Sequence, residues 1–206
     1  MEIVIGTRQQ LGAARLAQMD SYRYRVFVEA LGWDLPCEPH CERDQFDHEH
    51  TLYVLACNGR GEIIGTARLL PTHRPYLLKE VFPQLMAGQA LPQSAEIWEL
   101  SRFAAVDLAG DGQRVAGQFS SRIAVQLMEA VLRCAAEQGA RQLITVSPLG
   151  IERLLRRAGY CARRAAAPLR VGSHWLFACW IDLATQDYTI GEVTKGQGCR
   201  SMHRAA

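Results

Sequence analysis

The sequence predicts a single α/β domain, an α/β/α sandwich in which helices cover a mixed, mostly antiparallel sheet. Three observations lead to this fold class. Helical and strand-like patterns alternate along the 206 residues, an Asn58-Gly59 turn separates two β-rich segments, and 49% of the residues are hydrophobic. Alternating patterns favour layers of helix and sheet around one core. Asn-Gly is typical of a hairpin between antiparallel strands, and the chain length suits one domain.

The first elements predicted are a strand, a helix and a long loop. Residues 2–5 can form a short strand, and apolar residues then recur at helical spacing as far as Leu31. Gly32 is placed to end this helix, because glycine readily adopts the left-handed conformation found at helix C-termini. Residues 33–50 contain two prolines and many polar side chains, which indicates a loop. A loop of this length in a compact domain is usually functional or disordered.

The middle of the chain predicts three strands. Residues 51–57 and 62–70 flank the Asn-Gly turn and are rich in β-forming residues, so we expect them to pair antiparallel. Residues 71–92 form a connection with a short helix over 81–86. A central strand follows over residues 95–105.

The C-terminal half predicts two helices and two further strands. Residues 115–138 show the clearest amphipathic helical pattern in the chain. Residues 143–147 form a short buried strand, residues 150–158 a helix closed by Gly159, and residues 173–183 a final long strand. The order of elements therefore supports one mixed sheet between helices.

Composition narrows the possible function classes. The chain has 23 Lys and Arg residues against 21 Asp and Glu residues, a formal charge of +2, which gives no reason to expect a nucleic-acid partner. No segment approaches the roughly 18 apolar residues of a membrane helix, and the N-terminus resembles no signal peptide. Seven scattered cysteines fit reduced thiols better than a disulfide framework. We therefore expect a cytoplasmic protein without membrane insertion.

The domain is expected to span residues 1–190, and residues 191–206 are expected to be a loose tail. The tail holds several glycines together with small and basic residues. The chain contains neither a G-x-G-x-x-G pattern after a strand nor a P-loop pattern. A doubly wound nucleotide-binding fold is therefore disfavoured.

Charged residues set among aromatic ones predict a ligand site or an ion-pair network. A first group lies within 25 residues and contains Arg23, Arg25, Phe27, Trp33, Asp44 and Asp47. Arg68, Glu99 and Arg102 follow within apolar segments. A charge removed from water is costly unless it is paired. Arg68 must therefore reach water or pair, and its candidate partners are Asp44, Asp47 and Glu99.

Five segments, in their order and spacing, resemble the acyl-homoserine lactone synthases, the LuxI-type autoinducer synthases. They are YRYRVF at residues 22–27, LGW at 31–33, DQFD at 44–47, GTARLLPT at 65–72 and WELSRF at 98–103. The resemblance covers residues 2–183 and implies a fold similar to the GCN5-related N-acetyltransferases. In that fold two neighbouring strands splay apart and leave a cleft for an acyl thioester.

The resemblance also implies a reaction and its substrates. The α-amine of S-adenosylmethionine attacks the thioester of an acyl chain carried on acyl carrier protein. The methionyl carboxylate then displaces 5′-methylthioadenosine and closes the lactone, and the product is a diffusible quorum-sensing signal. S-adenosylmethionine is a substrate in this scheme, and neither step requires a metal or a redox cofactor.

The resemblance assigns one group of residues to the S-adenosylmethionine end of the site. These residues are Arg23, Phe27, Trp33, Asp44, Asp47, Arg68 and Phe103. Carboxylates and aromatic faces suit a substrate that carries a sulfonium and an ammonium group. An arginine can pair with the methionyl carboxylate through two parallel hydrogen bonds. The plain alternative for the acidic segment is a solvated polar loop.

Glu99 is the candidate general base, because the attacking amine must lose a proton before it reacts. Shielding by apolar neighbours raises the pKa of a carboxyl toward that role. In a regular strand Glu99, Ser101 and Phe103 share one face and Arg102 points to the other, whereas a bulge would change this. Ser101 is assigned to the acyl pocket and Arg102 to a supporting ion pair, and both complete the catalytic group.

The acyl pocket is assigned to residues that the predicted strands and helix bring near Ser101. The set is Leu100, Ser101, Met128, Thr145, Ser147, Leu149 and Trp175. In the family a hydroxyl at the place of Thr145 is linked with accepting 3-oxo chains. Threonine is also common in strands for steric reasons, so the oxidation state of the acyl group stays open.

Residues 153–170 contain six arginines and no acidic residue. Such a run is often only a solvated face. Acyl carrier protein is acidic, however, and a basic patch beside the cleft would speed its docking. The docking residues expected are Arg153, Arg156, Arg157, Arg163 and Arg164.

Three alternatives remain. The chain could be an acyl-CoA-dependent N-acyltransferase of the same fold, although Gln113, Arg114 and Gly117 match only part of the pyrophosphate loop of that class. It could be a non-catalytic protein that binds S-adenosylmethionine or acyl chains. A zinc site near Cys37 and Cys41 is disfavoured by its irregular spacing, and we expect no metal.

Overall fold

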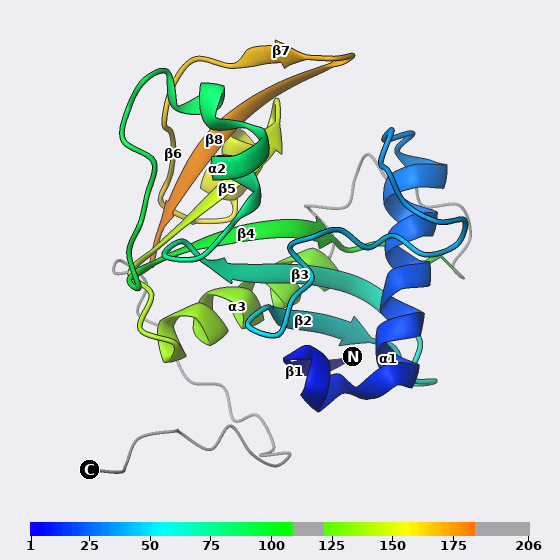
Figure 1. Ribbon diagram of the computed structural model, residues 1–206. Coiled ribbons are helices and arrows are strands. Elements are labelled where there is room, and N and C mark those ends of the chain that lie inside the picture. Colours follow the sequence, from blue (N-terminus) through cyan, green and yellow to red (C-terminus); the bar gives the residue numbers. More distant parts are fainter. Residues whose placement is uncertain (109–121, 184–206) are drawn as a thin grey trace.

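The computed structural model describes residues 1–108 and 122–183, and a single eight-stranded sheet runs through its centre (Figure 1). The strands are β1 Glu2–Gly6, β2 Leu52–Cys57, β3 Ile63–Pro71, β4 Ile97–Ala104, β5 Gln142–Pro148, β6 Ala162–Arg164, β7 Leu169–Val171 and β8 His174–Asp182. Their order is β1-β2-β3-β4-β5-β8-β6, with β7 paired to β8. Every pair is antiparallel except β4 with β5. The predicted mixed, mostly antiparallel sheet is confirmed.

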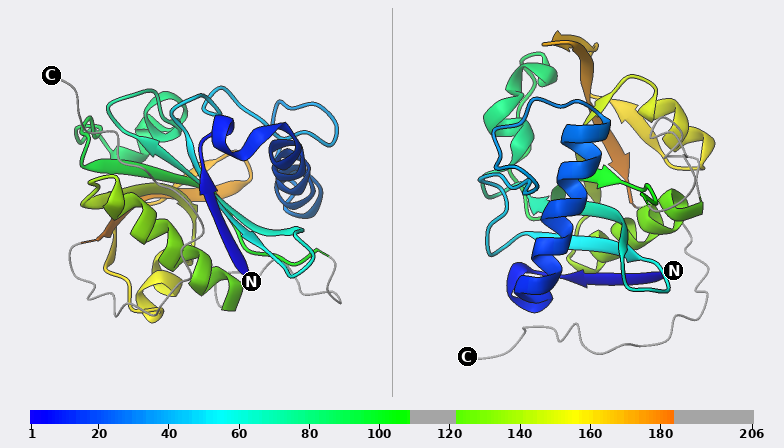
Figure 2. Two further views of the ribbon diagram at one scale, coloured as in Figure 1. Left: turned by 90° about the horizontal axis from the view of Figure 1, so that it is seen from below. Right: turned by 90° about the vertical axis from the view of Figure 1, so that its right-hand side faces the viewer.

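Helices cover both faces of this sheet. The helices are α1 Arg8–Arg23, the π-helix η1 Tyr24–Ala30, α2 Leu77–Val81, the 3-10 helix η2 Pro83–Met86, α3 Arg122–Glu137 and α4 Ile151–Arg157. Figure 2 shows α1 and α3 on opposite sides of the strands. The predicted three-layer sandwich is therefore confirmed.

The alternation of side chains along β2 shows how the two faces are filled. Val54 and Ala56 belong to the core that packs with α3, whereas Tyr53, Leu55 and Cys57 belong to the core that packs with α1. All five are fully buried. Successive strand residues point to opposite faces, so a strand covered on both sides is apolar throughout.

The first helix has the predicted extent but not the predicted regularity. It changes to a π-helix over Tyr24–Ala30, and Gly32 follows with a φ of 66°. Gly12 interrupts α1 with a φ of 73°, so the first turn departs from the axis of the rest. A side chain would be strained in that conformation.

β4 contains the irregularity that shapes the site. Thr66 pairs with Ala104 and Arg68 pairs with Ser101, so three steps along β4 oppose two along β3. The additional residue makes a β-bulge at Arg102, whose φ is 51°.

The other edge of β4 leaves β5 early. The last pair between them joins Glu99 and Ile144, although β4 continues to Ala104 and β5 to Pro148. The two strands diverge from this point in Figure 1. This is the splay that the resemblance implied.

Several local predictions need correction. The short helix expected over 81–86 begins earlier, as α2 over Leu77–Val81, and η2 then starts at Pro83. Proline disfavours a helical conformation in the preceding residue, which separates the two turns. β6 and β7 were missed, because each has three residues and forms by pairing with β8. The start of the helix expected over 115–138 and the tail expected over 191–206 lie outside the described residues.

Candidate active site

Three arginines and three carboxylates form an ion-pair network on the α1 face of the sheet. The network consists of Arg23, Glu42, Asp44, Asp47, Arg68 and Arg102. The arginines come from α1, β3 and β4, and the carboxylates come from the loop that precedes β2. Only Asp44 has appreciable solvent access, with 15% of its side chain exposed. The early acidic segment therefore lies over the middle strands, as predicted.

Asp47 is the most fully bonded carboxylate of the network. Its Oδ1 and Oδ2 accept hydrogen bonds from Arg23 Nη1 at 2.8 Å and Nη2 at 3.0 Å, and Oδ1 also accepts from the Tyr53 hydroxyl at 2.9 Å. Burial alone would raise the pKa of Asp47, but the charges of Arg23 and Arg68 outweigh it and hold that pKa well below its usual range. Asp47 is therefore ionised and ties α1 to the loop.

Arg68 on β3 forms ion pairs with carboxylates of the loop, which is one of the two predicted alternatives. Its Nη2 donates to Asp44 Oδ2 at 3.1 Å and its Nη1 lies 3.3 Å from Asp47 Oδ2. Its Nε donates to Ser101 Oγ at 3.0 Å. Of the three candidate partners, Asp44 and Asp47 are the ones that pair with Arg68. The Arg68 side chain therefore links β3 to β4 and to the loop.

The bulge turns Arg102 toward the same network. Its Nε and Nη2 donate to Glu42 Oε1 at 3.1 and 2.9 Å, and Nη2 also donates to Asp44 Oδ2 at 2.9 Å. The predicted supporting ion pair is confirmed. The opposite orientation of Ser101 and Arg102 was expected only for a regular strand. The bulge changes it, as anticipated, and both side chains lie on the α1 face.

An aromatic pair adjoins the network. The rings of Phe27 and Trp33 stack with centroids 4.9 Å apart, and the Arg102 guanidinium carbon lies 5.7 Å from the Phe27 centroid. Phe27 is fully buried, whereas Trp33 is partly exposed. An open aromatic face beside carboxylates is an environment that attracts a cation.

Glu99 is fully buried, and its carboxylate caps the N-terminus of α2. Its Oε2 accepts the backbone N–H of Leu77 at 2.9 Å and its Oε1 accepts that of Leu78 at 2.6 Å. Burial raises the pKa of Glu99 to about 7, because it outweighs these two hydrogen bonds and the nearby arginines. A carboxyl with this pKa can take up and release a proton near neutral pH. Its second function, as a helix cap, was not predicted.

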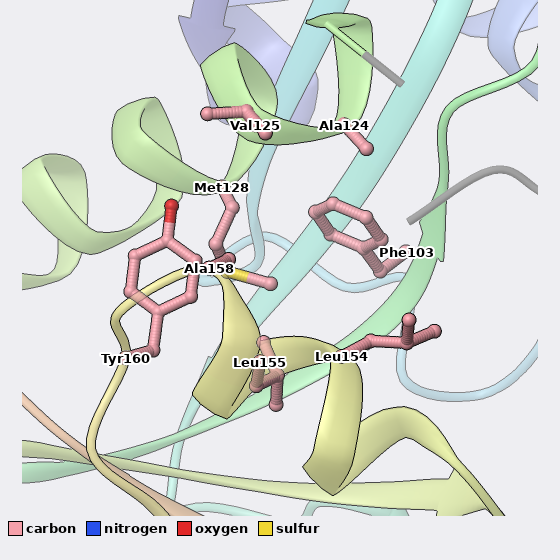
Figure 3. A pocket seen from close by; sticks show the side chains of 8 residues that line it. All are labelled: Phe103, Ala124, Val125, Met128, Leu154, Leu155, Ala158 and Tyr160. Carbon is pink, nitrogen blue, oxygen red and sulfur yellow. The ribbon is translucent and has the colours of Figure 1, made fainter. Parts of the chain in front are cut away.

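The opposite face of the sheet carries a small apolar pocket (Figure 3). It is lined by Phe103 from β4, by Ala124, Val125 and Met128 from α3, and by Leu154, Leu155, Ala158 and Tyr160 from α4 and its end. In a regular strand Phe103 would share a face with Glu99 and Ser101. The bulge is the anticipated exception and directs Phe103 toward α3 and α4.

The structure brings together only part of the predicted acyl pocket. Leu100 and Met128 pack in one core. Thr145 and Ser147 are buried side by side on β5, with their hydroxyl oxygens 3.4 Å apart. Ser101 lies on the other face, bonded to Arg68. Two members lie away from this core at the surface, Leu149 at 49% exposed and Trp175 at 51% exposed.

The arginine-rich segment lies on α4 and β6, beside the pocket. Arg156 and Arg164 pair with Glu152 at 3.2 and 2.6 Å, so an acid just before the run neutralises part of it. Arg163 lies over the Trp180 ring at 5.4 Å. Arg153 and Arg157 are exposed and form no ion pair in the described parts of the chain. These two exposed charges are therefore available to a partner, together with Arg163 and Arg170, which are also exposed and form no ion pair in the described ranges.

Two residues of the site escaped the sequence reasoning. Glu42 is 1% exposed and bonds both Arg23 and Arg102, and Tyr53 is fully buried against Asp47. Charge balance could have found Glu42, because three arginines within apolar surroundings need a third carboxylate beside the two aspartates. Tyr53 carries no comparable signal, since tyrosine is ordinary in strands.

Other candidate sites find less support. Gln113, Arg114 and Gly117 lie outside the described residues. Within residues 1–108 and 122–183 no three His, Cys, Asp or Glu side chains are placed to hold a metal ion, so Cys37 and Cys41 form no such cluster. The helices described in those ranges are too short or too polar to cross a bilayer.

Comparison with known proteins shows which family the chain resembles. Residues 8–189 match the family model of the autoinducer synthases. An acyl-homoserine-lactone synthase of Acinetobacter nosocomialis is 48% identical over 183 residues, which cover 89% of this chain and 100% of the relative. One from Pseudomonas aeruginosa is 36% identical over 181 residues, covering 86% of this chain and 84% of the relative.

Solved structures agree with this result. TofI, in a ternary complex with an inhibitor and MTA, superposes with a TM-score of 0.75 at 48% identity, covering 89% of this chain and 92% of that one. BjaI, a CoA-dependent acyl-homoserine lactone synthase solved with SAM and isopentyl-CoA, gives a TM-score of 0.76 at 30% identity, covering 88% and 82%. A putative N-acetyltransferase from Lactobacillus plantarum, 17% identical, covers 88% and 97% with a TM-score of 0.55 and shares the fold. The expected similarity to N-acetyltransferases is confirmed.

Proposed function

The chain belongs to the autoinducer synthase family and is an acyltransferase of the acyl-homoserine-lactone synthase kind, and from this premise we propose its substrates and its mechanism. It joins S-adenosylmethionine to an acyl chain delivered on acyl carrier protein. The product is an N-acyl-L-homoserine lactone, and 5′-methylthioadenosine is released. The observation that carries the proposal is the convergence of the ion-pair network and the Phe27–Trp33 pair on the β4 bulge, at the point where β4 leaves β5.

S-adenosylmethionine binds beside the aromatic pair. Its sulfonium and ammonium groups are attracted by the Trp33 face and by Asp44, the network carboxylate with the most exposed side chain. Its carboxylate pairs with an arginine of the network, for which Arg102 is suited because its guanidinium lies over the Phe27 ring. TofI with MTA and BjaI with SAM support this choice of substrate.

Glu99 acts as the general base, directly or through one water. It takes a proton from the α-ammonium group, and the neutral nitrogen then attacks the thioester carbon. The thiolate of the carrier leaves and takes up the second proton of that nitrogen, so that a neutral amide and the free carrier thiol are formed. A methionyl carboxylate oxygen next attacks the γ carbon, the bond from that carbon to the sulfonium breaks, and 5′-methylthioadenosine departs as the lactone closes.

The acyl chain occupies the pocket between α3 and α4. Its lining is apolar apart from the hydroxyl of Tyr160, and Figure 3 shows Phe103 and Tyr160 on opposite sides with Met128 between them. Thr145 and Ser147 on β5 supply hydroxyl groups near this face, which suits an oxidised position on the chain. Carrier protein docks on the exposed charges of Arg153 and Arg157, since α4 lines the pocket with its other face.

An acyl-CoA donor is the second candidate, because BjaI is described as CoA-dependent. The reaction at the nitrogen is the same for either thioester. Only the recognition of the carrier differs, so the two candidates are separated by the donor that the enzyme prefers.

The proposal is tested by incubating the protein with S-adenosylmethionine and matched acyl-acyl carrier protein and acyl-CoA donors of several chain lengths. Mass spectrometry then measures the lactone and 5′-methylthioadenosine. We expect equal amounts of both products, with a higher kcat/KM for the carrier-protein donors. A higher kcat/KM for acyl-CoA would overturn the choice of donor. Methylthioadenosine without lactone would overturn the synthase assignment.

A further inference from the structure

A second cavity lies between α1 and the loop segment 40–43, and none of the residues assigned to S-adenosylmethionine lines it. It is lined by Arg8, Ala13, Leu16, Ala17, Asp20, His40, Cys41 and Arg43, and has a volume of about 300 Å³. Volumes of this size are at the lower end for sites that bind small molecules. The break at Gly12 separates Arg8 on the first turn from the lining residues that follow it on α1. The cavity is thus built into the kinked helix and the loop segment that faces it.

Two buried polar atoms of its lining have no hydrogen-bond partner within the described ranges. They are Oδ1 of Asp20 and Nη1 of Arg8. Asp20 is only 2% exposed, and its other oxygen, Oδ2, accepts from Arg43 Nη2 at 2.6 Å. Buried polar atoms are nearly always hydrogen-bonded, so this pair of atoms marks an incomplete site.

The chemistry of the lining selects the ligand. Asp20 can accept a hydrogen bond from an amine, and Arg8 can donate one to a carboxylate, while Ala13, Leu16 and Ala17 provide apolar surface. A simple cation would meet two arginines, and a simple anion would meet the buried aspartate. A molecule that carries both an ammonium and a carboxylate satisfies both groups.

We propose that this cavity binds a small α-amino acid with an apolar side chain. The ammonium group of the ligand bonds Asp20, its carboxylate bonds the guanidinium of Arg8, and its side chain lies on the alanines of α1. Binding at this cavity is coupled to the ion-pair network through the loop, because the backbone N–H of Glu42 donates to the Asp20 carbonyl at 3.2 Å. The lining shares no residue with the proposed substrate site, and binding there needs no acyl donor.

The test titrates L-leucine into the uniformly ¹⁵N-labelled full chain and follows backbone amide shifts. We expect saturable shifts over residues 8–20 and 40–43 that persist with saturating 5′-methylthioadenosine. 4-Methylpentanoate, which lacks the amine, and 3-methylbutylamine, which lacks the carboxylate, are each expected to bind at least tenfold more weakly, by analogy with sites built to bond a missing polar group.

A matched pair of variants locates the binding. Ala17→Trp fills the cavity and should abolish the shifts, whereas Ala14→Trp, at an exposed position of the same helix outside the lining, should leave them intact. Absence of saturable shifts, equal binding of 4-methylpentanoate, displacement by methylthioadenosine, or unchanged binding in Ala17→Trp would each overturn the proposal.

Discussion

Substitution of Glu99 by Gln separates the proposed proton transfer from the support that this side chain gives to α2. The carboxyl is harder to ionise in the folded protein than in the unfolded chain, since burial raises its pKa from 4.5 to about 7. Its stabilising effect is therefore complete below about pH 4.5 and is lost as the pH rises toward 7. Each pH unit corresponds to about 1.4 kcal/mol, so this interval amounts to about 3 kcal/mol.

The same titration should act in opposite directions on rate and on stability. The ionised carboxylate is the proposed base, so kcat is expected to rise with pH to a plateau above about pH 7, while the free energy of unfolding falls over the same range. Gln cannot ionise, and as a cap it loses one of two acceptor oxygens, which costs about 1 kcal/mol. At pH 8 the Glu99→Gln variant should thus be more stable than the parent by about 2 kcal/mol.

Two assays measure these effects. Release of methylthioadenosine should show a kcat lowered by about 10²- to 10⁴-fold with little change in the Kd for S-adenosylmethionine. Urea unfolding between pH 5 and pH 8 should show a pH-dependent free energy for the parent and a nearly constant one for Glu99→Gln. Glu80→Gln, an exposed carboxylate on the same helix, is the control. An unchanged kcat, or a slow variant whose acidic pH limb matches that of the parent, would refute the reasoning.

Three further predictions concern the network, the docking surface and the pocket. Asp47→Asn should lower the free energy of unfolding, measured in urea, by about 3 to 5 kcal/mol, because it leaves buried arginines unpaired. The pKa of Asp47 is held below its usual range, so the stabilisation that this carboxylate provides is present above about pH 4 and is lost in acid. Reversal of charge at both Arg153 and Arg157 should raise the KM for acyl carrier protein about tenfold and leave that for S-adenosylmethionine unchanged in steady-state kinetics. Val125→Trp should narrow the pocket and shift the products measured by mass spectrometry to shorter chains, since each methylene excluded costs about 0.8 kcal/mol.

Each of these has a control on an exposed position. Asp34→Asn removes an exposed carboxylate and should leave unfolding unchanged, and Glu129→Trp adds a ring to the outer side of α3 without altering the products. A double charge reversal at exposed Arg60 and Arg133 changes the net charge by the same amount as the reversal at the docking surface, and it is the control for that variant. Equal loss for both substrates, or an equal effect of the control reversal, would contradict the docking assignment.

Much of the fold could be predicted from local patterns. The hairpin after Cys57 follows from its Asn-Gly turn, and the amphipathic pattern of α3 is recognisable wherever the structure describes it. β6 and β7 were not predictable in the same way, because three residues carry no period and their pairing depends on β8. The early start of α2 was also missed, and its N-terminus depends on a carboxylate that lies 21 residues further along the chain, at Glu99.

The site was predictable as a set of residue types but not as a geometry. The need to pair buried charges predicted that Arg68 would meet the aspartates of the loop. The alternation rule then failed at Arg102, because a single additional residue in β4 reverses the orientation of every side chain after it. Phe103 lies on the opposite face for the same reason, where it lines the apolar pocket.

The separation of charged network and apolar pocket by the thickness of one sheet has an evolutionary consequence. On the proposed assignment of the two sites, repacking of α3 against α4 alters the length of the acyl chain without changing the side chains proposed to hold S-adenosylmethionine. Bacterial lineages can therefore come to produce signals with different acyl chains through substitutions on one side of the sheet alone. The bulge in β4 constrains both faces of the sheet. Deletion of its additional residue would turn the side chains that follow it to the opposite faces.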